Sequence, residues 1–126
     1  MNKSFFILYV RDQVVSAEFY THALGCEPIV NVPGITEYEL SPECYLGLMP
    51  VAGIKSLLGS ALPDPNAGDG IPRAELYLNV NHPEEYHRRA LEAGARELSP
   101  LLPRDWGDTA AYSLDPDGHV LAFANG

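Results

Sequence analysis

The strongest constraint on the fold is an internal repeat of one strand–helix–three-strand pattern. In the first half, the apolar run FFILYV at residues 5–10 predicts a buried strand. The segment DQVVSAEFYTHALG begins with an N-capping aspartate, repeats Val15, Phe19 and Ala23 at a spacing of four, and ends at Gly25, which predicts a helix. Three β-rich segments, IVNV, ITEYEL and CYLGLM, follow it. The first half therefore predicts a βαβββ unit.

The second half repeats this order. AELYLNV at residues 74–80 predicts a strand, and Pro83 fits the first turn of a helix that Gly94 ends. RELSPLL, TAAYSL and HVLAFA predict three further strands. The chain is thus expected to have an α+β fold built from two tandem βαβββ repeats.

The repeat also sets the expected domain organisation. A chain of 126 residues is long enough for one domain with a sizeable core. We expect a single domain over 1–126, with the first half at 1–49 and the second at 74–126. The connection at 50–73 is rich in glycine and proline and has an apolar stretch that suits one short helix. It is either a mobile lid or a plain linker, and the sequence leaves both open.

Composition narrows the classes of partner. The net charge of −9 argues against nucleic acid and anionic membranes, because both attract basic proteins, whereas it suits a cationic small molecule. No apolar run is long enough to span a membrane. Cys26 and Cys44 form neither a CxxC motif nor a disulfide framework, so we expect buried thiols and a reducing, cytoplasmic location.

The closing segment SLDPDGHVLAFANG raises the question of a metal site, because two aspartates and a histidine lie within five residues. Asp115, Pro116 and Gly118 each suit a tight turn: aspartate begins it, proline fixes φ and glycine accepts a positive φ. Carboxylates within one turn rarely hold an ion without further ligands. The pattern therefore favours a hairpin turn.

The segments YVRD…AEFYTHALG and WGDTAAYSLDPDGHVLAF, placed on this repeat, resemble the vicinal-oxygen-chelate superfamily. That superfamily groups glyoxalase I, bleomycin resistance proteins, fosfomycin resistance proteins and extradiol dioxygenases. The resemblance implies a cupped mixed sheet with helices on the outside, a small-molecule ligand in the cup, and a homodimer. In character the chain is most similar to the metal-free, bleomycin-resistance-like members.

The resemblance also places four potential metal positions on the cup, at Phe5, Met49, Glu75 and Ala122. Phenylalanine and alanine have no ligand atom, and one carboxylate cannot hold a hard divalent cation against water. We therefore expect no metal and no cofactor. No catalytic residue is predicted apart from Glu75, a candidate general base.

The predicted cup also carries an aromatic binding surface beside the Glu75 carboxylate. Stacking rings next to a carboxylate suit a flat, cationic ligand. Trp106 and Tyr112 are placed on it by the resemblance, and Tyr77 by its strand face. Packing in the hydrophobic core is the alternative role for Phe5, Ile7 and Met49. The candidate ligand-binding residues are Phe5, Tyr45, Met49, Glu75, Tyr77, Trp106, Tyr112 and Ala122.

Three functions remain open. The first is a small-molecule binding protein that takes an aromatic or cationic metabolite or antibiotic in a metal-free cup. The second is a glyoxalase-like lyase or isomerase, or a dioxygenase-type enzyme, with an atypical metal site or with Glu75 as general base. The third is an inert interaction module with a filled cup. Metal content separates the metal enzyme from the others, and ligand screening separates the binder from the module.

Overall fold

The computed structural model describes residues 1–126 and divides into two compact units. The first unit comprises residues 1–17 and 26–69, and the second comprises 18–25 and 70–126. Helix α1 (Gln13–Leu24) contributes to both units. Whether the two halves form a single domain stays a prediction.

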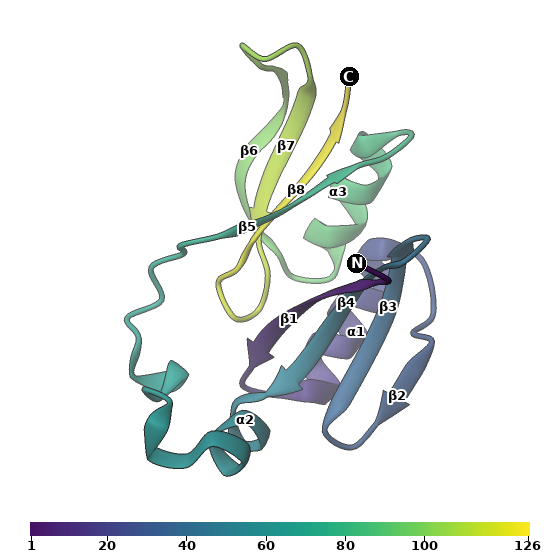
Figure 1. Cartoon of the computed structure of the whole chain (residues 1–126). Helices are drawn as coiled ribbons and strands as arrows, with labels where there is room; N and C mark the ends of the chain where they lie inside the picture. The colour runs from purple at the N-terminus through teal and green to yellow at the C-terminus, as the bar shows by residue number, and fades with distance from the viewer. The chain divides into compact units, whose positions relative to one another are not determined.

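The first unit contains a four-stranded mixed sheet (Figure 1). Its strands lie in the order β1-β4-β3-β2, with β1 parallel to β4 and the other pairs antiparallel. The strands are β1 (Ser4–Val10), β2 (Val30–Val32), β3 (Ile35–Ser41) and β4 (Cys44–Pro50). The helix predicted in the connection is present as α2 (Val51–Leu58), and two short 3-10 turns, η1 (Gly59–Ala61) and η2 (Pro65–Ala67), follow it.

The second unit repeats this topology. Its strands lie in the order β5-β8-β7-β6, again with one parallel pair, β5 and β8. Its elements are β5 (Glu75–Asn79), α3 (Pro83–Glu92), β6 (Arg96–Pro103), β7 (Thr109–Leu114) and β8 (Val120–Asn125). The two tandem βαβββ units predicted from the sequence are confirmed.

Helix α1 begins and ends where the sequence predicts. The Asp12 carboxylate accepts a hydrogen bond from the Val15 backbone N–H at 3.1 Å, and Gly25 has the left-handed φ of +70° that ends a helix. The predicted buried stripe is only partly correct. Phe19 and Ala23 are buried but Val15 is 49% exposed, because the buried face is shifted by one residue and starts at Ser16.

Helix α3 covers one face of the second sheet. Tyr86 packs on Phe123 with ring centroids 5.1 Å apart, and Leu121, Phe123 and Ala111 are fully buried. Because successive strand residues point to opposite faces, the neighbouring residues Ala122 and Tyr112 lie on the other face. The candidate site is built on that face.

The surface departs from expectation at the cysteines. Cys26 is exposed rather than buried, since it lies after Gly25 at the end of α1, and Cys44 is half-buried at the start of β4. Neither forms a disulfide.

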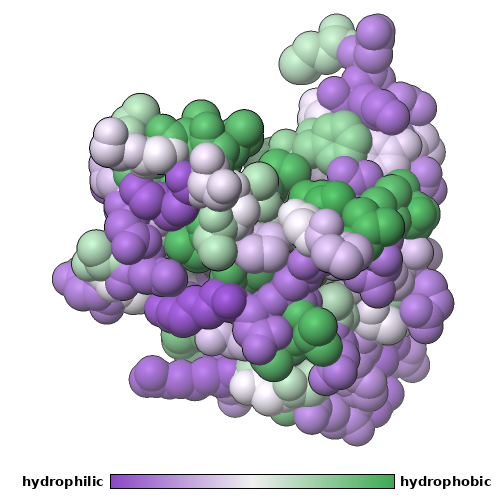
Figure 2. Space-filling view, turned by 90° about the horizontal axis from the view of Figure 1, so that it is seen from below, coloured by the Kyte–Doolittle hydropathy of each residue, from purple (hydrophilic) through white to green (hydrophobic).

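None of the helices combines the length and apolarity that a transmembrane segment requires. Figure 2 shows apolar residues lying among polar ones over the face in view.

Candidate functional site

The candidate site lies on the face of the second sheet opposite α3, called here the open face. Strand register aligns one row of residues across it: Tyr77 on β5 is paired with Ala122 on β8, which is paired with Tyr112 on β7. Ser99 on β6 completes the row. Ala122 is fully buried, whereas Tyr77 and Tyr112 on either side of it are half-buried. Two tyrosines thus flank a small residue on this face.

Trp106 joins this row through its indole nitrogen. Its Nε1–H donates to the Tyr77 hydroxyl at 3.0 Å, and that hydroxyl donates to Asp108 Oδ2 at 2.6 Å. Trp106 lies in a tight loop that Gly107 permits with a φ of +102°. Trp106 is 60% exposed although its indole N–H is hydrogen-bonded. The loop therefore presents an oriented tryptophan ring to solvent.

The electrostatics of the Tyr77 hydroxyl follow from this placement. Partial burial and the hydrogen bond to the Asp108 carboxylate raise the pKa of Tyr77 above its ordinary value. The hydrogen bond from Trp106 opposes them and is weaker in effect. Tyr77 therefore stays a neutral donor that ties the loop to β5.

Glu75 lies two residues before Tyr77 on the same strand face. It is exposed and makes no hydrogen bond or ion pair within the chain. Because β5 is an end strand, its first residue remains exposed. An exposed carboxylate can attract a cation.

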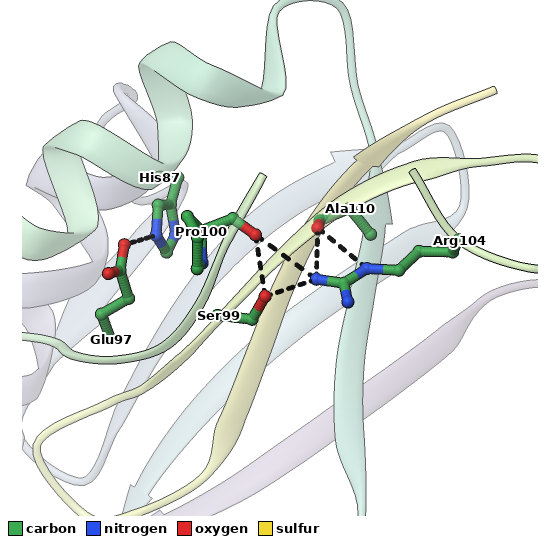
Figure 3. A network of polar contacts seen from close by, with 6 residues as sticks. All are labelled: His87, Glu97, Ser99, Pro100, Arg104 and Ala110. Atoms are coloured by element: carbon green, nitrogen blue, oxygen red, sulfur yellow. Dashed lines mark hydrogen bonds and ion pairs between the residues drawn. The ribbon is translucent and has the colours of Figure 1, made fainter. Parts of the chain in front are cut away.

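Arg104 is a residue of this face that the sequence did not single out. Its guanidinium donates hydrogen bonds to Ser99 Oγ at 2.6 Å and to the Ala110 carbonyl oxygen at 2.8 Å (Figure 3). It also lies 5.1 Å from the centroid of the Tyr112 ring. The only signal in the sequence was its position two residues before Trp106. Its acceptors include backbone carbonyls, which no side-chain pattern reveals.

The remaining predicted ligand-binding residues lie in the first unit. Phe5 and Tyr45 stack with centroids 5.0 Å apart and ring planes 22° apart. Lys3 Nζ lies 5.6 Å and 5.4 Å from the two ring centroids. Met49 is half-buried on the same strand face as Tyr45. These residues form an aromatic cluster of their own with a bound side-chain cation.

Strand register tests the metal positions that the resemblance implies. Ile7 pairs with Gly47 as Tyr77 pairs with Ala122, so Gly47 is the repeat counterpart of Ala122, and Met49 lies two residues further along. A Cβ built at Gly47 would meet Ile7 Cδ1 at 2.5 Å. No three His, Cys, Asp or Glu side chains are grouped so that they could hold a metal ion. The residues present do not fit the family's metal.

The DPDG segment is a hairpin turn, as predicted. The Asp115 carbonyl accepts from the Gly118 N–H at 3.0 Å, and Gly118 has a φ of +87°. The buried Asp115 carboxylate accepts from the backbone N–H groups of Asp117 and His119 at 2.9 and 2.8 Å. Its donors are supplied by the turn and by a helix residue, Tyr20, at 2.7 Å. The carboxylate is therefore occupied by structural contacts.

Comparison with known proteins agrees with this architecture. Residues 4–123 match the model of the Glyoxalase/Bleomycin resistance protein/Dioxygenase superfamily. An uncharacterized protein of Mycobacterium bovis is 26% identical over 115 residues, which cover 89% of this chain and 75% of that protein. A glyoxalase-related enzyme from Fulvimarina pelagi superposes with a TM-score of 0.81 at 26% identity, over 98% of this chain and 86% of that one. A family enzyme from Burkholderia phytofirmans PsJN superposes at 0.80 with 20% identity, over 97% and 96%.

Proposed function

Because the chain belongs to the Glyoxalase/Bleomycin resistance protein/Dioxygenase superfamily, we propose that it is a small-molecule binding protein. The open face of the second sheet takes a flat aromatic ligand, which stacks on Trp106. A cationic group on the ligand is attracted by Glu75. Ligands of this class include aromatic metabolites and antibiotics that carry a basic nitrogen.

The observation that carries the proposal is the exposed but oriented ring of Trp106. Most of its surface remains in water, yet its Nε1–H is bonded to Tyr77, so the ring loses little further freedom when a ligand stacks on it. Tryptophan is the side chain with the largest stacking surface and the best cation–π face. A pre-oriented ring of this kind suits binding more than it suits packing.

The Glu75 carboxylate on the open face supports a cationic group on the ligand. Glu75 is exposed and has no partner within the chain, so a ligand cation would not have to displace one. The net charge of −9 also attracts cations over longer distances, and salt weakens this attraction.

The binding proposal requires no metal. Of the four positions that the family's metal-dependent members use, Phe5 and Ala122 have no ligand atom and Glu75 offers a single carboxylate. Gly47, which strand register makes the repeat counterpart of Ala122, has no side chain. Met49 offers a thioether, which is a poor ligand for a hard cation. No feature of the exposed Glu75 favours the enzyme over the binder.

We also propose a homodimer. Strand β1 is the end strand of the first sheet, so its outer backbone edge is unpaired within that sheet, and Phe5, Phe6 and Ile7 are 40%, 59% and 40% exposed. An apolar end strand of this kind favours association with another chain. A second copy is the partner we propose.

The binding proposal is tested with three indoles that share one ring and differ in charge: tryptamine, indole-3-ethanol and indole-3-acetate. Trp106 is the only tryptophan, so a ¹⁵N-labelled protein gives one indole N–H signal. We expect this signal to shift saturably with the indoles, and tryptamine to bind more tightly in wild type than in Glu75→Gln.

Calorimetry on variants checks the assignment. Trp106→Ala is expected to cost about 1–3 kcal/mol of binding free energy. Leu57→Ala, which removes an exposed apolar side chain of α2 in the first unit, serves as the control and should cost nothing. Binding that survives both Trp106→Ala and Glu75→Gln would place the ligand elsewhere.

A further inference from the structure

The loop between β6 and β7 holds the guanidinium group of Arg104 in place through two of its three nitrogens, and the third nitrogen has no hydrogen-bond acceptor in the protein. Arg104 Nε donates to the Ala110 carbonyl at 3.2 Å, while Nη2 donates to Ala110, Ser99 and Pro100 oxygens at 2.8, 2.6 and 3.3 Å (Figure 3). Nη1 makes no hydrogen bond and is not buried. Two N–H groups of a rigidly held cation therefore point away from every protein acceptor.

The charge of this guanidinium is not balanced by an ion pair. All three of its acceptor residues supply neutral oxygens, and no carboxylate lies within ion-pair distance. By contrast, Arg88 pairs with Glu92 at 3.0 Å. A chain with 17 acidic and 8 basic residues has ample carboxylates to pair with an arginine. That Arg104 is positioned without one leaves its full positive charge for a ligand.

The open face holds this cation close to the aromatic site. Arg104 lies over the Tyr112 ring, and Tyr112 and Tyr77 flank Ala122 in the same row. Two strand spacings separate Tyr112 from Tyr77, a distance of about 10 Å. Trp106 is bonded to Tyr77, so the stacking ring and the guanidinium lie on one face of one sheet.

We propose that Arg104 Nη1 anchors an oxyanion, a carboxylate or phosphate, on the ligand of the open face. This inference rests on the proposed binding function and deepens it: the ligand class becomes aromatic carboxylates or phosphates, with Glu75 taking a basic group where the ligand has one. Because Nε and Nη2 are already occupied, contact is through one nitrogen and not through the two-nitrogen fork that arginine often uses.

The competing role for Arg104 is purely structural, since Nε and Nη2 hold the loop to Ala110 and Ser99. The two roles use different nitrogens and predict different ligand selectivity. A structural clamp loses stability on mutation but leaves the ratio of affinities for anionic and neutral ligands unchanged. If Arg104 is an oxyanion anchor, its mutation removes the preference for anionic over neutral ligands.

The test uses the whole protein and two NMR signals, the Trp106 indole N–H and the Arg104 Nε–H. Probes are indole-3-acetate, indole-3-ethanol, phenyl phosphate and inorganic phosphate. We expect indole-3-acetate to bind about tenfold more tightly than indole-3-ethanol. Arg104→Gln is expected to reduce this ratio to within twofold. Arg73→Gln, which removes an exposed arginine of the same unit, is the charge-matched control and should keep the tenfold ratio.

Each outcome is decisive. If Trp106 responds to indole-3-ethanol but Arg104 responds to no oxyanion, or the ratio survives in Arg104→Gln, the oxyanion anchor is wrong and the binding function stands. If Arg104 responds to phenyl phosphate or indole-3-acetate while Trp106 responds to no probe, the anchor stands without the stacking site. If neither the Trp106 nor the Arg104 signal responds to any probe, both the binding function and the oxyanion anchor are wrong. A response to inorganic phosphate as strong as to phenyl phosphate would mean a free-anion site that needs no aromatic ring. The Arg104 signal is read on wild type, so the test does not depend on how well the variants fold.

Discussion

The Tyr20 hydroxyl donates a hydrogen bond of 2.7 Å to the Asp115 carboxylate, across 95 positions of the sequence. Both groups are buried, and His119 Nδ1 lies 2.8 Å from the same carboxylate oxygen. The contact attaches the end of α1 to the turn between β7 and β8. It explains why aspartate, and not only a turn-forming residue, stands at 115.

The first prediction concerns acid stability. Burial by itself would raise the pKa of Asp115, but the hydrogen bonds from His119 and Tyr20 outweigh it and lower the pKa below the ordinary value. A lowered carboxyl pKa adds stability that is fully present above the unfolded-state pKa of about 4 and is lost as pH falls through the folded-state value. Asp115→Asn should therefore cost about 1–3 kcal/mol of unfolding free energy at pH 7 and progressively less below about pH 4.

Urea unfolding from pH 7 to pH 3 measures this difference. The exposed Asp69→Asn is the matched control, with an expected change within about 0.5 kcal/mol at every pH. A stability difference for Asp115→Asn that stays constant down to pH 3 would contradict the argument.

The second prediction concerns the hydroxyl partner. Tyr20→Phe keeps the buried ring and removes one donor to a buried carboxylate, so it should cost about 1.5–3 kcal/mol. Tyr38→Phe removes a 2.8 Å bond to the neutral Ala17 carbonyl and should cost less, about 0.5–1.5 kcal/mol. Equilibrium denaturation compares the two. Equal costs would mean that the charge of Asp115 adds nothing to the Tyr20 bond.

The sequence predicted the fold well because its signals were local. Apolar, β-rich runs marked the strands, and Gly25 and Gly94, which have φ of +70° and +104°, marked the helix ends. The burial expected for the first strand is wrong, because β1 is an end strand whose Phe5, Phe6 and Ile7 are 40%, 59% and 40% exposed. The repeat then gave the topology. The exposure of Val15 escaped prediction because adjacent apolar residues in α1 leave the buried face ambiguous by one position.

The site was less predictable because its contacts are not local. Alternation placed Glu75 and Tyr77 on one face correctly, but it did not show that Glu75 is exposed at the start of an end strand. The Trp106–Tyr77 bond spans 29 positions and depends on the loop conformation. Arg104 bonds largely to backbone oxygens, which are present at every residue and carry no sequence signal.

The third prediction concerns metal. Since Phe5 and Ala122 offer no ligand atom and Met49 offers only a thioether, the purified protein should hold no stoichiometric divalent metal. A chelator should leave its melting temperature unchanged, because only a bound ligand stabilises by mass action. Elemental analysis and a thermal melt measure the two quantities. One equivalent of zinc, nickel or manganese that a chelator removes with loss of stability would overturn the metal-free assignment.

The fourth prediction concerns the proposed dimer. Phe6→Glu places a charge on the exposed apolar strand β1 and should convert a dimer to a monomer, because burying an unpaired charge costs several kcal/mol. Light scattering after size exclusion gives the mass directly. Leu57→Glu, on an exposed apolar residue of α2, is the control and should stay dimeric. A wild-type protein that is monomeric at all concentrations would refute the dimer.

The last prediction concerns how Tyr77 orients Trp106. Tyr77→Phe removes the acceptor for the indole N–H and leaves the ring of the phenylalanine in place, so the indole signal should broaden or shift upfield as the N–H turns to water. Asp108→Asn keeps the Trp106–Tyr77 bond but replaces the carboxylate that raises the pKa of Tyr77. The indole shift should then begin to change at lower pH than in wild type, where the raised pKa keeps Tyr77 protonated beyond about pH 10. An indole signal that is identical in wild type and Tyr77→Phe would show that the loop alone fixes the ring.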